Sequence, residues 1–137
     1  MHRIVKGFVA QGGDITRHDG SGGEVWMSDL PHNVCSYPQS IYGGKFNDEK
    51  QGLAIKPHRG SLAMANSGKN TNTSQFFVVL TDEEKQLAKM KGKYVVFGEL
   101  KVGWEVLTRI EEVTTTDGSD GKSRVPVWIG GCGTCLP

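Results

Sequence analysis

The sequence contains few cysteines, and their pattern is not that of a disulfide-stabilised domain. Its 137 residues include three cysteines, Cys35, Cys132 and Cys135, and an odd number in a chain of this size does not indicate a disulfide framework. The spacing of Cys132 and Cys135 suits a redox or metal site, but no helix N-terminus follows to lower a thiol pKa. A zinc site would need two more ligands, which His32 and Cys35 could supply. We interpret the thiols as structural and expect no metal and no cofactor.

Long hydrophobic runs and an excess of one charge are also absent. No apolar run approaches the length of a membrane span, and no charged-then-apolar segment typical of a secretory signal opens the chain. Lys and Arg total 16 and Asp and Glu total 15, which gives a net charge of +1. This balance gives no support for a nucleic-acid or membrane partner. We therefore expect a cytoplasmic protein with a single domain over residues 1–137.

Glycine is abundant, and it separates short apolar runs. The 19 glycines exceed the usual share of roughly 7% and form no repeat, which favours a turn-rich, mainly β fold. Phe8 and Ala10 alternate with Val9 and Gln11, as in a short strand between turns at residues 7 and 12–13. Residues 15–18 are predicted to continue extended, and further strands are predicted at residues 61–65, 75–80, 93–100 and 125–129. The run 75–80 is nearly all apolar, so we expect burial on both of its faces.

Two helices and one long loop complete the prediction. Thr81 and Glu84 have the spacing of a capping box, which predicts a short helix ending near Met90. Over residues 102–113 an amphipathic helix is predicted, because apolar residues recur at helical spacing, namely Val102, Val106, Ile110 and Val113, with Leu107 widening the stripe. Residues 24–39 contain Trp, Tyr and Pro without a period and are interpreted as an inserted loop.

Four segments of the chain together resemble a known family. They are HRIVKGFVAQGGD (residues 2–14), LAMANSG running into NTNTSQFF (62–68 and 70–77), VVFG (95–98) and IGGCG (129–133). In this order they are similar to the cyclophilin peptidyl-prolyl isomerases, and they span nearly the whole chain. The resemblance implies an antiparallel β-barrel with capping helices, and an enzyme that accelerates rotation about X-Pro bonds during protein folding. It also implies proline-containing peptides or proteins as partners.

The chain departs from the family pattern in three places. The family has two further strands and a helix before the residues matching His2 and Arg3, so the chain is either a fragment or an incomplete barrel, whose unpaired strand edges invite dimerisation. Residues 24–39 are an insertion near the substrate groove. The family commonly carries Trp, its donor to the drug cyclosporin, where Lys89 stands, and His where Tyr94 stands. We therefore expect weakened cyclosporin binding.

The chemistry of the reaction points to Arg3. Rotation about an X-Pro amide must overcome a barrier of roughly 18–20 kcal/mol because resonance gives the C–N bond double-bond character. No bond is broken, so neither a nucleophile nor a general base is needed. In the twisted state the prolyl nitrogen gains a lone pair, and a fixed cation with N–H donors binds that state better than the planar one. The always-charged, planar guanidinium of Arg3 suits this role better than Lys would.

The resemblance assigns the remaining site residues. Gln11 is the second catalytic candidate, and with the backbone of Asn66 it would hold the substrate so that one side of the bond rotates. Apolar side chains would form the proline pocket, namely Phe8, Val9, Phe77, Met90 and Tyr94. Ala65 and Gln75 would line the neighbouring groove. Ser21, Lys45 and Ser67 match positions that gate a second pocket, for the residue two before proline.

Two other interpretations remain open from the sequence. The chain could be a module that binds Pro-containing segments with little or no turnover, a reading that the altered pocket wall favours. It could also be a metal or redox protein using its three cysteines, which would then carry bound zinc. An isomerase assay on an X-Pro peptide separates the first of these from the enzyme.

Overall fold

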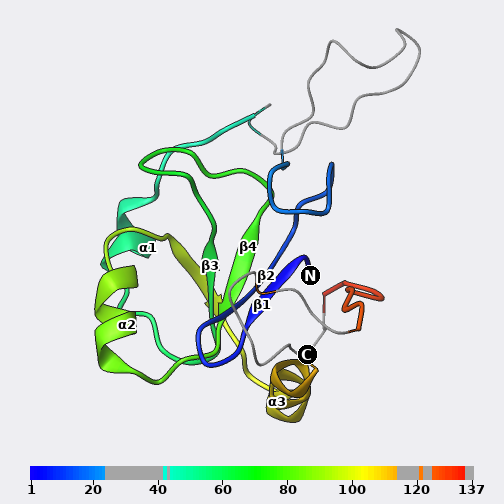
Figure 1. Ribbon diagram of the computed structural model, residues 1–137. Coiled ribbons are helices and arrows are strands. Elements are labelled where there is room, and N and C mark those ends of the chain that lie inside the picture. Colours follow the sequence, from blue (N-terminus) through cyan, green and yellow to red (C-terminus); the bar gives the residue numbers. More distant parts are fainter. Residues whose placement is uncertain (24–41, 43, 114–120, 122–124, 135–137) are drawn as a thin grey trace, which may run out of the picture.

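The computed structural model describes residues 1–23, 42, 44–113, 121 and 125–134 (Figure 1). The predicted insertion at residues 24–39 lies outside these ranges, as do Cys35 and Cys135. Within the described ranges, none of the helices is long and apolar enough to cross a bilayer. No group of three or more potential metal-binding side chains occurs in this part of the chain.

An antiparallel sheet of five strands forms the centre of the described part, in the order β1-β2-β4-β3-β5. The strands are β1 (Arg3–Val5), β2 (Val9–Gly12), β3 (Ser61–Met64), β4 (Phe76–Val79) and β5 (Val96–Glu99). β1 and β2 form a hairpin whose turn places Gly7 at a positive φ of 67°, a conformation that favours glycine. The fold is mainly β as expected, and the sheet formed by the described residues is open rather than a closed barrel.

In the part of the chain that the structure describes, three helices flank the sheet: α1 (Lys50–Ala54), α2 (Glu84–Met90) and α3 (Trp104–Glu112). α1 was not predicted. It packs closely on β5 at Gly52, where an added Cβ would lie 2.6 Å from Val95 Cγ1 and 2.8 Å from the Val96 carbonyl oxygen. Figure 1 shows α1 and α2 on one side of the molecule and α3 beneath the sheet on the other.

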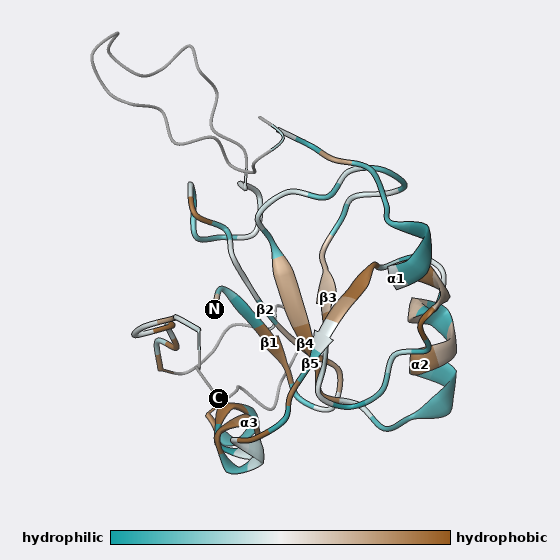
Figure 2. Ribbon diagram, turned by 180° about the vertical axis from the view of Figure 1, so that it is seen from behind, coloured by the Kyte–Doolittle hydropathy of each residue, from teal (hydrophilic) through white to brown (hydrophobic). Residues whose placement is uncertain are grey.

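The two faces of the sheet bury separate hydrophobic clusters. The first lies between the sheet and α2 and contains Val9, Ala63, Phe77, Val79, Leu87, Met90 and Val96. The second lies toward α3 and contains Ile4, Ala10, Leu80 and Leu107. Hydrophobic residues accordingly concentrate on the strands, whereas α1 and the loops beyond the sheet are hydrophilic (Figure 2). In β4, Phe77 and Val79 are buried while Phe76 and Val78 are half-buried, so its two faces are covered unequally.

The structure corrects four local predictions. Thr81 does not cap α2, because its hydroxyl accepts a bond from the Glu83 N–H at 3.0 Å and the helix begins at Glu84. Residues 15–18 are not extended, because this part of the chain bends around Asp14. Residues 125–129 form no strand. α3 buries Leu107 and Glu111, whereas Val102 and Val106 from the predicted apolar stripe are 81% and 57% exposed.

Candidate active site

The strand register places Arg3 in one row with other predicted site residues. Arg3 pairs with Gln11, Gln11 with Phe77 and Phe77 with Ala63. Directly paired residues in antiparallel strands project from the same face of a sheet, so Arg3, Gln11 and Phe77 share one face. That face also holds Val9 and its cluster.

The stem of Arg3 is packed while its charged end has no partner in the described structure. A Cβ added to Gly121 would lie 2.8 Å from Cγ of Arg3, and the Gly121 carbonyl accepts the Ile4 N–H at 2.6 Å. Among the described residues, none forms an ion pair or hydrogen bond with the Arg3 guanidinium. The guanidinium is thus held at its base and retains its donors.

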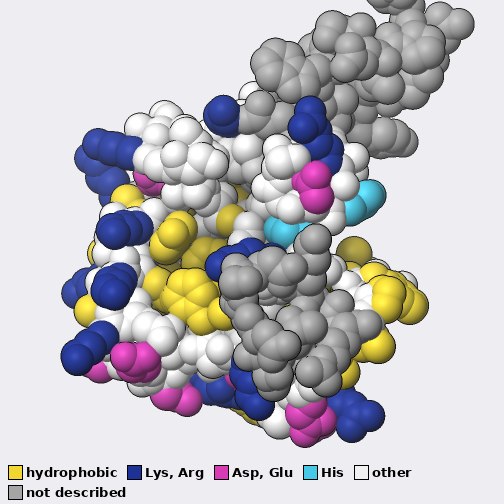
Figure 3. Space-filling model, in the orientation of Figure 1, with side chains coloured by type: hydrophobic (Ala, Val, Ile, Leu, Met, Phe, Trp, Pro, Cys, Tyr) yellow, Lys and Arg dark blue, Asp and Glu magenta, His cyan; other side chains and the backbone are white. Residues whose placement is uncertain are grey.

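An aromatic and aliphatic cluster lies beside this row on the same face. Phe77 is 5% exposed, and its ring meets Tyr94 edge to face with the centroids 5.1 Å apart. Val9 and Met90 are buried in the same cluster, and Phe8, Ala65 and Tyr94 pack against it as half-buried residues. Figure 3 shows the exposed part of a hydrophobic patch on this side of the molecule, bordered by Lys and Arg side chains.

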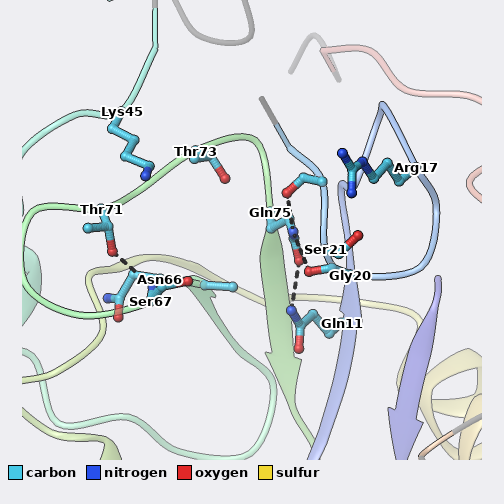
Figure 4. Close-up of a pocket in the computed structure, with 12 residues that line it drawn as sticks. Gln11, Arg17, Gly20, Ser21, Lys45, Asn66, Ser67, Thr71, Thr73 and Gln75 are labelled. Atoms are coloured by element: carbon cyan, nitrogen blue, oxygen red, sulfur yellow. Dashed lines mark hydrogen bonds between the residues drawn. The ribbon is translucent and has the colours of Figure 1, made fainter. Parts of the chain in front are cut away.

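A polar cavity of about 330 Å³ opens at the other end of β2 (Figure 4). It brings together seven predicted residues, namely Gln11, Ser21, Lys45, Ala65, Asn66, Ser67 and Gln75. Arg17, Thr71 and Thr73 also line it and were not predicted. In Figure 4 Lys45 and Arg17 extend from opposite sides of the cavity, with the two glutamines between them. No motif in the sequence signals Arg17, which enters the site only because the chain bends around Asp14.

Gln75 connects the polar cavity to the sheet. Its Nε2 donates to the carbonyls of Gly20 at 3.1 Å and Gly22 at 2.7 Å, and its Oε1 accepts from Nε2 of Gln11 at 2.9 Å. Gln75 is 7% exposed, so these bonds fix its amide orientation. Gln11 spends one of its two amide N–H groups on Gln75 and keeps the other, together with its oxygen, for a ligand.

Asp14 organises the loop that carries Gly20 and Ser21. The residue is 4% exposed, and its carboxylate accepts hydrogen bonds from five backbone N–H groups at 2.8–3.2 Å, namely those of Thr16, Arg17, Asp19, Gly20 and Gly22. Burial by itself raises the pKa of Asp14, but the hydrogen bonds from the loop outweigh it and hold the pKa well below its usual range. The loop is therefore held together by hydrogen bonds to a charged carboxylate rather than by buried apolar side chains.

The Asn66 side chain holds its own loop in place. Its Nδ2 donates to the Lys93 carbonyl at 2.9 Å, and its Oδ1 accepts the Gly68 N–H at 3.2 Å. Within the described residues its backbone N–H and C=O form no hydrogen bond. They are therefore available at the edge of the cavity, where an extended peptide could pair with them.

The site thus combines the Arg3 cation, an apolar slot and a polar cavity on one sheet face. The apolar slot is the cluster of Phe8, Val9, Phe77, Met90 and Tyr94. This arrangement can bind an extended peptide and stabilise a twisted amide. A comparison with protein-family models matches residues 1–134 to the family described as cyclophilin type peptidyl-prolyl cis-trans isomerase/CLD. Because the match covers nearly the whole chain, the protein belongs to the cyclophilin-type peptidyl-prolyl cis-trans isomerase family.

Proposed function

We propose that Arg3 is the catalytic residue of this isomerase and that it donates to the lone pair of the twisted prolyl nitrogen. The observation that supports this is the row Arg3–Gln11–Phe77 on one sheet face. The proline ring would lie against Phe77 and the neighbouring apolar side chains, within reach of the row. Because the stem of Arg3 is packed against Gly121, little reorganisation is needed when the amide twists.

Gln11 and Asn66 hold the peptide on the side that precedes the proline. The remaining N–H of Gln11 donates to a substrate carbonyl, and the Asn66 backbone pairs with the extended chain. Ser21, Lys45 and Ser67 then meet the residue two before proline in the polar cavity. The cluster of Phe8, Val9, Phe77, Met90 and Tyr94, together with Ala65, excludes water from the rotating bond, which weakens solvation of the planar state.

An isomerase assay that follows exchange between cis and trans forms by NMR tests the role of Arg3. We expect Arg3→Ala to lower kcat/KM about a thousandfold while peptide affinity changes little, because the lost bond forms only in the twisted state. Arg109→Ala is the control: Arg109 is an exposed arginine of α3, paired with Glu112, and its loss should leave the rate unchanged. Full activity of Arg3→Ala, or peptide binding by the wild type without turnover, would contradict the proposal.

Three further proposals concern the surroundings of the site. Residues 24–39 adjust substrate preference, since the chain enters them at Gly23, which packs against Thr73 and Gln75. Identical isomerase rates on a series of peptides before and after deletion of residues 24–39 would refute this.

Cyclosporin binds weakly because Lys89 replaces the family's indole donor, and calorimetry giving an affinity ordinary for the family would contradict this proposal. The exposed free thiol of Cys132 supports a reducing compartment such as the cytoplasm, and fractionation tests this.

A further inference from the structure

A second groove, of about 530 Å³, lies at the end of the sheet opposite the polar cavity. The β1–β2 turn forms one wall and α2 with the residues after it forms the other. Three apolar residues of the slot line it, namely Phe8, Met90 and Tyr94, and three lysines stand around them, namely Lys6, Lys89 and Lys93. We call this the lysine groove. It is the continuation of the apolar slot away from the polar cavity.

The positive charge of the lysine groove is not neutralised by the described part of the protein. Among the described residues, no Asp or Glu lines the groove, and none forms an ion pair with its three lysines. Lys56, by contrast, is paired with Glu84 at 2.7 Å. The carboxylate of Glu83, just before α2, accepts a hydrogen bond from Nε2 of Gln86 at 2.5 Å and pairs with none of the three lysines. The groove therefore suits an anionic group.

The position of the lysine groove decides which part of a substrate reaches it. The chain runs from Phe8, in the groove and just before β2, to Gln11 of β2, in the polar cavity, a span of about 10 Å at the rise of an extended strand. A peptide with its residue two before proline in the cavity would cross the slot with the proline. The residues after the proline would then enter the lysine groove.

We propose that the lysine groove selects substrates carrying an Asp or Glu within three residues after the proline, a specificity that rests on the proposed substrate path. The lysine stems cover apolar surface while their ammonium groups remain at the rim. In that position they would surround a carboxylate that extends from the bound peptide. Figure 3 shows Lys and Arg side chains along the side of the hydrophobic patch that lies over α2.

Matched peptides measure this preference. Each has one X-Pro bond and carries Glu at the first, second or third position after the proline, with Gln at the same position in its partner. Exchange rates by NMR and affinities by calorimetry are taken for the wild type, for a variant with Lys6→Gln, Lys89→Gln and Lys93→Gln, and for Lys91→Gln. Lys91 is the control because it ends the same helix as an exposed lysine and does not line the groove.

We expect the wild type to favour Glu over Gln by about three- to tenfold in kcat/KM at one position at least, since exposed ion pairs are individually weak. High salt should reduce this ratio, as it screens exposed charges. The ratio should fall to about one in the triple variant and persist in Lys91→Gln. Equal turnover of Glu and Gln peptides at all three positions, or a ratio kept by the triple variant, would overturn the inference. If no peptide is isomerised, the catalytic proposal fails, and the Glu to Gln ratio of affinities still decides the role of the groove.

Discussion

At the scale of single residues, the polar cavity depends most on one buried carboxylate. Asp14 binds five backbone N–H groups of the bent loop, and Gly22 allows the approach, since an added Cβ would lie 2.4 Å from Asp14 Oδ1. The sequence offered only a weak signal for this, an Asp with Thr two residues later, which is a common side-chain turn. Residues 15–18 were therefore predicted to be extended, and the bend around this internal anchor was missed.

The lowered pKa of Asp14 gives stability a defined pH dependence. Its pKa in the folded protein lies below that of the unfolded chain, which is about 3.9, so the unfolded state binds more protons between the two values. The free energy of unfolding should therefore be fully supported by Asp14 above about pH 4 and should fall as the solution is made more acidic. Urea unfolding at neutral pH and at about pH 3 measures this change.

Asp14→Asn should reduce that pH dependence and lower stability at neutral pH by about 2–4 kcal/mol, because an amide NH₂ faces some of the loop donors. Asp82→Asn is the control, since Asp82 is exposed and carries no comparable set of bonds. If both variants unfold at the same urea concentration as the wild type, Asp14 does not anchor the loop. We also expect Asp14→Asn to alter preference for the residue two before proline, because Ser21 lies on this loop.

At the scale of elements, the sequence predicted the strands better than their surroundings. The alternation in residues 8–11 and the apolar run at 75–80 carry their own signal, and both became paired strands. α1 has five residues, too few for a hydrophobic period, and its Gly52 disfavours a helix in isolation. Residues 125–129 have strand composition, but a strand also needs a partner. Here Val127 instead accepts a bond from the Met1 amino group at 2.5 Å.

The candidate site was predictable only as far as motif residues extend. Arg3, Gln11 and Phe77 could be named from the sequence because they lie in motifs, yet their common row depends on the register of three strands. The lysine groove joins residues from two distant segments, and nothing local in either segment signals it. The contacts of Glu111 were likewise not predictable: the residue belongs to an amphipathic helix, but its carboxylate binds Gly7 and Arg59, which are distant in the sequence.

Glu111 connects α3 to two turns near the site. Its Oε1 accepts the Gly7 N–H at 3.1 Å, and its Oε2 pairs with Arg59 at 2.5 Å, while Arg59 also donates to the Leu80 carbonyl. The two side chains are 11% and 27% exposed. Removing the carboxylate leaves the Arg59 charge largely buried and unpaired, which is costly. The pair also fixes the turn that presents Phe8.

Glu111→Gln should therefore destabilise the protein by about 2–3 kcal/mol, a value reduced from that of fully buried pairs because Arg59 is partly exposed. The adjacent Glu112→Gln is the control and should cost less than about 0.5 kcal/mol, since its pair with Arg109 is exposed. Urea unfolding of both variants checks this difference. Equal midpoints for the two variants would show that the Arg59 pair contributes no more than a surface pair does.

At the scale of the whole molecule, an open sheet leaves its two outer strands, β1 and β5, at the edges. Described segments cover part of each edge, since Gly121 bonds to Ile4 of β1 and Gly52 of α1 packs on Val96 of β5. On the α3 side, Val106 and Trp128 remain 57% and 75% exposed. A groove of about 500 Å³ there is lined by apolar residues, with Glu105 and Arg109 also in the lining. The apolar residues are Val106, Ile110, Val113, Val125 and Val127.

Pairing an exposed strand edge and covering an apolar surface both lower the free energy. We therefore predict that two copies of the chain associate through the apolar surface at α3. Sedimentation velocity over a range of concentrations should show a dimer fraction that rises with concentration.

Trp128→Lys should weaken the dimer, because a second copy would have to bury the added charge. The exposed Tyr42, which is 63% exposed on the side of the polar cavity, provides the control variant Tyr42→Lys. A monomer at every concentration would refute the prediction. The isomerase rate per chain should stay constant through the transition, since Arg3, Gln11 and Phe77 all come from one copy.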